Sequence, residues 1–380
     1  MSLRVSLKAA ASYDRAVVER ALEELLAPLG GMEAFVRPGQ RVLIKPNLLS
    51  AKAPEKAVTT HPEVVRAVIR LAQRAGGIVS VGDSPGVGGP RQVAARCGIL
   101  AVVEETGAHF APFHESVRIK TQGRTFQELE IARDILDAEV IINLPKLKTH
   151  QMMGFTCAVK NLFGAVVGMR KPRLHLQAGT DKAFFALMLL ELAEEIRPAL
   201  SIVDAIVGME GDGPGSGDPV SIGALLAGVD PLAVDTAAAE LVGLPVELDW
   251  PRRVARESGR AGTRLEEIEL LGDPLATLRL RRFRPAKKGD VGFGLPPFLK
   301  QRLRRALTAL PVVEEQRCTA CGLCVKHCPP KTMNLAAGKV RIDYSNCIGC
   351  FCCQELCPHK ALTTRQGMLL RLSQLFSRSC

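Results

Sequence analysis

Residues 318–330, CTACGLCVKHCPP, and residues 347–359, CIGCFCCQELCPH, carry the strongest pattern in this 380-residue sequence. In each segment four cysteines are spaced C-x2-C-x2-C-x3-C, with a proline directly after the fourth, and the second segment has a fifth cysteine, Cys352, outside that spacing. This is the spacing of bacterial ferredoxins, in which tight loops turn three thiolates toward one [4Fe-4S] cubane while the fourth thiolate reaches the other cluster. The pattern therefore predicts two linked [4Fe-4S] clusters in a small ferredoxin-like fold.

The two motifs exchange their fourth ligand in such an arrangement. We expect one cluster to be held by Cys318, Cys321, Cys324 and Cys357, and the other by Cys347, Cys350, Cys353 and Cys328. Structural zinc and a disulfide framework are the alternatives. Zinc sites usually come as two CxxC pairs without the third and fourth cysteine or the proline, so the spacing favours iron–sulfur clusters.

The chain upstream of these motifs is long enough for one large domain. Short apolar runs that end in polar loops alternate there with helical patterns, which is typical of α/β construction. Strands are expected over 41–44, 77–81, 139–144 and 200–203, and helices over 62–75 and 181–197. The sequence thus predicts a large, mostly parallel α/β domain followed by a small α+β ferredoxin-like domain.

The expected boundaries follow from composition. The α/β domain spans 1–284, and the ferredoxin domain with its two clusters spans 317–364. Between them, 285–316 is expected to be a linker that contains a basic amphipathic helix at 298–310. A helical tail is expected over 365–380.

Polar residues follow each predicted strand, at the edge of a parallel sheet where ligands bind. Lys146, Lys148 and His150 alternate along an expected extended loop, so they could face one side. The two ammonium groups would clamp a carboxylate or phosphate, and His150 would donate a proton. Further ligand or cofactor contacts are expected from Lys45, Asp83, Lys160 and Asp204. A solvated basic loop is the alternative for this group.

Standard nucleotide-binding fingerprints are missing from the sequence. The glycine-rich stretch 208–217 has no G-K-[ST], and 82–89 lacks the G-x-G-x-x-G spacing of a Rossmann turn. Carboxylates around 204–235 could hold Mg²⁺, although their spacing matches no dedicated metal loop. A flavin bound by unfamiliar loops is also left open.

The formal net charge is +11, and aromatic residues make up only 4% of the chain. Few aromatics argue against base-stacking platforms, so nucleic acid is not an expected partner. The basic ferredoxin segment suits docking of an acidic electron donor or acceptor such as a ferredoxin, and the basic helix would allow peripheral membrane contact. No apolar signal segment is visible, and the longest apolar stretch, 183–192, is too short to span a bilayer. We expect a cytoplasmic protein from an organism, such as an anaerobe, in which oxygen-sensitive clusters survive.

Several longer motifs resemble the DUF362 family. They are KPNLL at 45–49, THP at 60–62, GDSPG at 82–86, NLPKLKTH at 143–150, KNLFG at 160–164 and DAIVGMEGDGPGSGDP at 204–219. In that family a large α/β domain often precedes a ferredoxin-like segment, so the resemblance implies the same two-domain layout here. It adds weight to the strand-end residues as site candidates, and it implies no substrate.

Two functions fit these observations. The first is an iron–sulfur oxidoreductase that relays single electrons through two [4Fe-4S] clusters to a site in the α/β domain that binds an anionic small molecule. The alternative is a non-enzymatic electron-transfer subunit or maturation factor. Convergence of Lys146, Lys148 and His150 on one pocket would favour the enzyme, and splaying of these side chains into solvent would favour docking.

Overall fold

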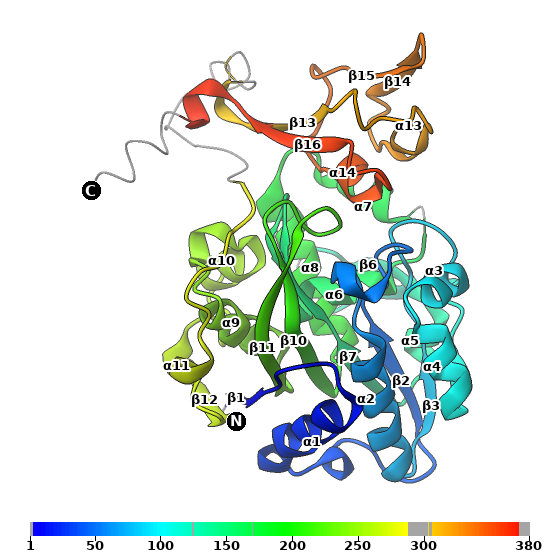
Figure 1. Cartoon of the computed structure of the whole chain (residues 1–380), viewed down its shortest axis with the longest axis vertical. Coiled ribbons are helices and arrows are strands. Elements are labelled where there is room, and N and C mark those ends of the chain that lie inside the picture. The colour runs from blue at the N-terminus through cyan, green and yellow to red at the C-terminus, as the bar shows by residue number, and fades with distance from the viewer. Residues whose placement is uncertain (1–2, 124, 169, 288–302, 304–305, 372–380) are drawn as a thin grey trace.

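The computed structural model describes residues 3–123, 125–168, 170–287, 303 and 306–371. A large α/β part is built on one 10-stranded sheet, and a small part with the cysteine motifs lies above it (Figure 1). The predicted fold class, a mostly parallel α/β domain followed by a small α+β domain, is confirmed. Within the described residues, no helix is both long and apolar enough to cross a membrane.

The main path of the sheet runs β12-β1-β11-β10-β7-β2-β3-β4, and β8 and β9 branch from β10. Neighbours from β10 to β4 are parallel, whereas β11 is antiparallel to both β10 and β1. The strands are β1 (Leu3–Ala9), β2 (Arg41–Pro46), β3 (Ile78–Val81), β4 (His109–Phe110), β7 (Val140–Leu144), β8 (Lys146–His150), β9 (Gly154–Thr156), β10 (Leu200–Glu210), β11 (Asp218–Gly228) and β12 (Ile268–Gly272). A separate hairpin pairs β5 (Ser116–Lys120) with β6 (Glu128–Ala132).

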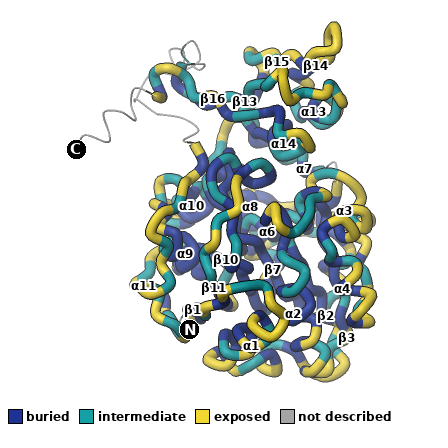
Figure 2. Tube along the Cα trace, viewed as in Figure 1, coloured by how far each residue is buried: buried dark blue, intermediate teal, exposed yellow. Residues whose placement is uncertain are grey.

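Helices cover both faces of the sheet because the central strands are apolar on both sides. In β2, Val42 and Ile44 pack with one helical layer while Leu43 packs with the other. The first layer contains α1 (Arg15–Leu26), α2 (Pro62–Arg74), α3 (Pro90–Arg96) and α4 (Ile99–Thr106). The second contains α6 (Ala158–Asn161), α7 (Arg170–Ala178), α8 (Lys182–Ile196), α9 (Pro231–Leu241) and α10 (Trp250–Glu257). Figure 2 shows that the central strands between these layers are buried.

Two predicted helices lie within one residue of their expected bounds. Helix α2 begins at Pro62, and His61 caps it by accepting the backbone N–H of Glu63 on its Nδ1 at 3.3 Å. Helix α8 is capped by Asp181, whose side chain accepts from Phe184 N at 2.9 Å. Caps of this kind satisfy backbone donors that have no partner within the helix, which is why they mark helix starts in a sequence.

The C-terminal part contains β13 (Ala309–Val313), α13 (Leu323–His327), β14 (Met333–Ala336), β15 (Lys339–Ile342), α14 (Cys352–Leu356) and β16 (Leu362–Gln366). Strand β13 pairs with β16, and β14 pairs with β15, both antiparallel. Cys350, Phe351 and Cys352 belong to the same hydrophobic cluster as residues of α6 and α8. The small part is therefore packed onto the α/β part.

Four expectations about local structure change. Residues 309–313, expected partly as helix and linker, form β13 because they pair with β16, and 365–366 belong to β16 rather than to a helical tail. Residues 298–302, 304 and 305 of the expected basic helix lie outside the described residues, as do residues 372–380. Residues 146–150, expected as a loop, form β8 because they pair with β10 and β9. The strand expected over 200–203 continues to Glu210, so Gly208 of the glycine-rich stretch lies within β10.

Candidate functional site

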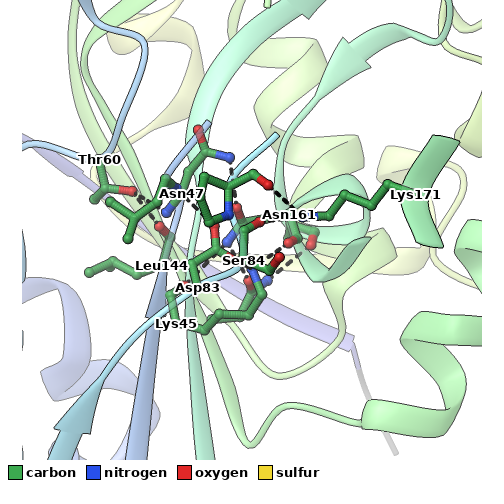
Figure 3. A network of polar contacts seen from close by, with 12 residues as sticks. Lys45, Asn47, Thr60, Asp83, Ser84, Leu144, Asn161 and Lys171 are labelled. Atoms are coloured by element: carbon green, nitrogen blue, oxygen red, sulfur yellow. Dashed lines mark hydrogen bonds and ion pairs between the residues drawn. The ribbon is translucent and has the colours of Figure 1, made fainter. Parts of the chain in front are cut away.

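A buried ion pair joins Lys45, near the end of β2, to Asp83, which follows β3. Lys45 Nζ lies 2.8 Å from Asp83 Oδ1 and donates to the backbone oxygen of Asn161 at 2.5 Å. Burial lowers the pKa of Lys45, and the carboxylate of Asp83 opposes that shift. Figure 3 shows both side chains in one polar network. A Cβ at Gly164 would overlap Asp83 Oδ1, so the loop needs glycine there to approach the pair closely.

A second buried pair joins Lys146 of β8 to Asp204 of β10, with 2.8 Å between Lys146 Nζ and Asp204 Oδ2. The hydroxyl of Tyr13 lies 2.8 Å from Asp204 Oδ1 and accepts from Lys146 Nζ at 2.7 Å. The backbone N–H of His61 also donates to Asp204, at 2.9 Å. Burial lowers the pKa of Lys146, and Asp204 opposes the shift. The side chains of Lys146 and Asp204 thus satisfy each other, and neither lines the cavity described next. Our expectation that both would contact a ligand is corrected accordingly.

A cavity of about 230 Å³ lies where the C-terminal part meets the carboxyl ends of the parallel strands. The α/β part contributes lysines from three elements: Lys148 from β8, Lys160 from α6 and Lys171 from α7. The C-terminal part contributes Cys352 and Glu355, both on α14. Figures 1 and 2 place α14 directly above α7. Both parts of the chain are therefore needed to form the cavity wall.

Lys148 is buried at this wall without an acidic partner. Its Nζ donates to Asn47 Oδ1 and to the backbone oxygen of Val58, each at 2.7 Å. Both acceptors are neutral, so burial dominates and lowers the pKa of Lys148 to about 7. At neutral pH this side chain can therefore either carry a positive charge or release a proton.

The other two lysines of the cavity contact neutral groups directly, and carboxylates act on them from further away: Glu355 on both and Asp83 on Lys171. Lys171 Nζ donates to the backbone oxygens of Ser84 and Pro85, and burial lowers its pKa to about 7. Figure 3 shows Lys171 reaching Ser84 from α7. Lys160 Nζ lies 4.8 Å from the centre of the Phe163 ring, and burial lowers the pKa of Lys160 as well. Both lysines could therefore bind an anionic ligand.

His150 connects the two parts of the chain. Its Nδ1 accepts the backbone N–H groups of Met152 at 3.1 Å and Met153 at 3.2 Å. A ring nitrogen that accepts cannot carry the proton, so the hydrogen-bond network assigns the proton to Nε2, which lies 3.2 Å from Glu355 Oε1. Burial lowers the pKa of His150, Lys160 lowers it further, and Glu355 opposes the shift.

The arrangement changes the role expected for His150. Burial by itself raises the pKa of Glu355, but His150 and Lys160 lower it, to about 2. We assign the lowering to the Lys160 charge, because a neutral His150 supplies only its N–H. The pair is thus a neutral imidazole facing an ionised carboxylate. Such an imidazole orients Glu355 better than it donates a proton, and Lys148 is the better proton donor.

Five buried polar atoms of cavity-lining residues have no hydrogen-bond partner in the described structure, and three of them, Asp83 Oδ1, His150 Nε2 and Glu355 Oε1, belong to the ion-pair contacts given above. The other two have no such contact either. They are Nδ1 of His175, on α7, and Oγ1 of Thr156, at the end of β9. Burial lowers the pKa of His175 to about 3, so its ring is neutral. Buried polar atoms are usually satisfied, so unpartnered atoms beside a cavity are positions where a bound group can be accommodated.

The eight motif cysteines surround two further cavities. One is lined by Cys318, Cys321, Cys324 and Cys357, and the other by Cys328, Cys347, Cys350 and Cys353. These are the two sets expected from the spacing, including the exchanged fourth ligands. Among the residues that the structure describes, no group of three or more His, Cys, Asp or Glu side chains is arranged to hold a single metal ion. Four thiols around a hollow suit a cubane, which bonds one sulfur at each of its four irons.

The two cysteine sets differ in burial. Cys321 is exposed, and Cys318 and Cys357 are partly exposed, whereas all four cysteines of the second set are buried. The extra cysteine of the second motif, Cys352, is also buried and lines the cationic cavity. The second set is therefore the one next to the α/β part.

Comparison with known proteins agrees with this two-part organisation. The family model described as a domain of unknown function, DUF362, matches residues 42–240, and a 4Fe-4S dicluster domain model matches residues 310–358. The chain belongs to the DUF362 family. The resemblance and the presence of an iron–sulfur domain, both predicted from the sequence, are confirmed.

This DUF362 protein is 40% identical over 304 residues to the Thylakoid-associated protein sll1697 of Synechocystis sp.. That match covers 79% of this chain and 93% of the relative. Among solved structures, the lactate racemase apoprotein of Thermoanaerobacterium thermosaccharolyticum is similar over 60% of this chain and 54% of its own, with 16% identity and a TM-score of 0.39. A similarity that low carries neither fold nor activity over to this chain.

Three residues that line the cavity between the two parts were not predicted from the sequence: Lys171, His175 and Glu355. Lys171 and His175 lie four positions apart, one turn along α7, so they share a helix face. Glu355 lies between Cys353 and Cys357, inside the second cysteine motif. The spacing of Lys171 and His175 was a usable signal. Nothing in the sequence pattern paired Glu355 with His150.

Proposed function

We propose that this chain is an iron–sulfur oxidoreductase that transfers electrons to a small anionic molecule bound in the cavity between its two parts. The observation that carries the proposal is the position of α14. Its Cys352 and Glu355 line the cavity, while Cys353 and Cys357, on the same helix and directly after it, belong to the two cysteine sets. Clusters held there would supply one-electron transfer next to a cationic binding site.

The proposal assigns a role to five polar residues that line the cavity. Lys160 and Lys171 bind the anion, and Lys148 donates a proton because its pKa of about 7 matches neutral pH. His150 orients Glu355, which fixes α14 against β8. Reduction of a substrate bond requires two electrons from an external reduced protein and two protons from solvent, one of them through Lys148.

The external partner is proposed to be an acidic electron-transfer protein such as a ferredoxin. Cys321 is exposed, so the first cysteine set is accessible to a docking protein. Lys326 and Lys331 on this part of the chain supply positive charge that would steer an acidic partner toward it. A cytoplasmic location is proposed as well. Peripheral association with a membrane is the competing proposal, because the Synechocystis relative is named as a thylakoid-associated protein.

The direct test uses protein purified without oxygen, in which iron, sulfide and chromophores released by acid are measured. We expect roughly eight irons per chain, as two [4Fe-4S] clusters require. Calorimetric titration with small carboxylates and inorganic phosphate then tests the cavity. Full iron content without any anion binding would favour the alternative, an electron-transfer subunit or maturation factor. Iron content below roughly half of that value, with zinc present, would contradict the cluster assignment.

A further inference from the structure

The charges at the cavity between the two parts do not balance. Two carboxylates, Asp83 and Glu355, line it, and each already faces a partner from the α/β part. Asp83 is paired with Lys45 at 2.8 Å, and Glu355 faces the neutral ring of His150 at 3.2 Å. Asp83 is thus neutralised by Lys45, whereas Glu355 keeps its negative charge and offsets part of the charge of Lys160.

Four ammonium groups belong to the same region: Lys45, Lys148, Lys160 and Lys171. Within the described residues, only Lys45 has a carboxylate in ion-pair contact. When all four are protonated, four positive charges against two negative charges leave a surplus of two. Buried charges are costly unless they are paired, so this surplus favours a ligand that brings two negative charges.

The size of the cavity limits the ligand further. A volume of about 230 Å³ is small for a ligand pocket. It lies below the 300–1,000 Å³ or so that is typical of pockets for drug-sized ligands. A small ligand therefore suits the cavity better than a nucleotide does.

We propose that the cavity binds a small dianion, held by Lys148, Lys160 and Lys171, with the unpartnered polar atoms of His175 and Thr156 completing the contacts. This inference rests on the proposed function and names the substrate class of that same site. Phosphate and a short dicarboxylate share the chemistry that these residues recognise, which is oxygen-borne double negative charge.

The test is calorimetric titration of the full chain, with its clusters intact and without oxygen. The probes are succinate, inorganic phosphate and acetate at one ionic strength. We expect succinate or phosphate to bind at least about tenfold more tightly than acetate, because the dianion engages one more charge-assisted contact. The ratio of succinate to phosphate affinity shows whether the natural ligand is a dicarboxylate or a phosphorylated compound.

Variants connect the binding to the proposed residues. Lys171→Met and, independently, Lys160→Met should each weaken dianion binding by about tenfold or more while changing acetate binding less. Lys120→Met is the matched control, because Lys120 is an exposed lysine on β5 that does not line the cavity. Two variants are used so that a folding defect in one leaves the other informative, and circular dichroism checks the fold of each.

The outcomes separate the inference from the function on which it rests. Acetate binding as tightly as succinate and phosphate would overturn the dianion inference but leave an anionic substrate in place. Unchanged dianion affinity in both folded lysine variants would likewise overturn it. Absence of binding by all three probes would instead count against the proposed anion-binding function itself.

Discussion

Two lysines on one strand should respond in opposite ways to the same substitution. Lys146 and Lys148 are two residues apart on β8, and both are buried. Lys146 is ion-paired with Asp204, whereas Lys148 faces the cavity and contacts only neutral oxygens. We predict that Lys146→Met destabilises the α/β part and that Lys148→Met chiefly removes anion binding.

The stability that Lys146→Met is expected to cost depends on the carboxylate of Asp204, which stays buried without its lysine. Removing one partner of a buried ion pair costs about 3–5 kcal/mol because the other charge stays buried. Asp204 keeps the hydroxyl of Tyr13 at 2.8 Å and the N–H of His61 at 2.9 Å. Because these two donors remain, we expect the free energy of unfolding to fall by about 3 kcal/mol, the lower end of that range.

The expected loss for Lys148→Met is smaller. The substitution leaves Asn47 Oδ1 and the backbone oxygen of Val58 without this donor, which costs about 1–3 kcal/mol for each acceptor left unsatisfied. It also removes an ammonium group that is buried without a counter-charge, and this gain offsets much of the cost. Its anion affinity should fall by about tenfold or more, because a charge-assisted contact is lost.

The assay is denaturant unfolding followed by the fluorescence of Trp250. It is the one tryptophan of the chain and lies at the start of α10, so the signal reports on the α/β part. Coincidence with far-ultraviolet circular dichroism checks that the transition is two-state. Succinate titration of both variants supplies the second measurement, and Lys146→Met should stay within about threefold of the unmodified protein. A larger stability loss in Lys148→Met than in Lys146→Met, or loss of anion binding in Lys146→Met alone, would refute the assignment of the two lysines.

Three further predictions concern the cysteines and pH. Cys321→Ser should lower the iron content per chain by about half, from roughly eight irons to roughly four. The unfolding of the α/β part, followed by Trp250 fluorescence, should stay unchanged. A simultaneous loss of the folded α/β part would show that the two parts do not fold independently. Cys352→Ser should keep the full iron content, because Cys352 belongs to neither set, whereas Cys350→Ser should lose one cluster; equal iron loss in both variants would contradict the ligand sets. Succinate affinity should be full below pH 7 and fall above it, by up to about tenfold per pH unit for each of Lys148 and Lys171, because their free-state pKa is about 7 and a bound anion raises it.

The pH prediction depends on the groups that surround the titrating lysines. Lys148 is influenced by Glu355, Lys160, Lys146 and Asp83, and Lys171 by Asp83, Lys45, Lys160 and Glu355. Both carboxyls of succinate titrate below pH 7, so the ligand is a dianion over the range above pH 7 in which its affinity is expected to fall. Calorimetry at several pH values in two buffers of different ionisation enthalpy should show proton uptake on binding near pH 7–8. Affinity that is constant from pH 6 to 9 would contradict the prediction.

Local sequence signals predicted much of this protein because they report on local physics. Cysteine spacing encodes which thiols can reach one cubane, and the structure places the same sets around two hollows. Helix α2 begins at Pro62, where the sequence predicted a helix to start, and His61 supplies there the acceptor that backbone donors at a helix start need. Polar residues after apolar strands marked the edge where the cavity lies, and Lys148, His150 and Lys160 all line it.

The pairing of the strand-end residues required the tertiary structure. Lys146 and Lys148 occupy alternate positions in the sequence, which suggested that both would contact one ligand. In the structure, β10 runs beside β8 with a register shift between Asp204 and Met209. That shift sets Lys146 opposite Asp204 and Lys148 opposite Met209, so one lysine is neutralised and the other is not. No local pattern encodes a contact between residues 58 positions apart.

The amino-acid pattern was sufficient for the elements, the cluster ligand sets and the edge of the sheet where polar groups collect, because each depends on residues close together in the chain. Only the packed molecule showed that α7 and α14 complete the cavity, with Lys171 and His175 on one side and Glu355 on the other. Glu355 and His150 are separated by about two hundred residues of sequence and meet at 3.2 Å. Their meeting depends on how the small part packs on the large one, and that packing is set by the sum of many contacts rather than by any short motif.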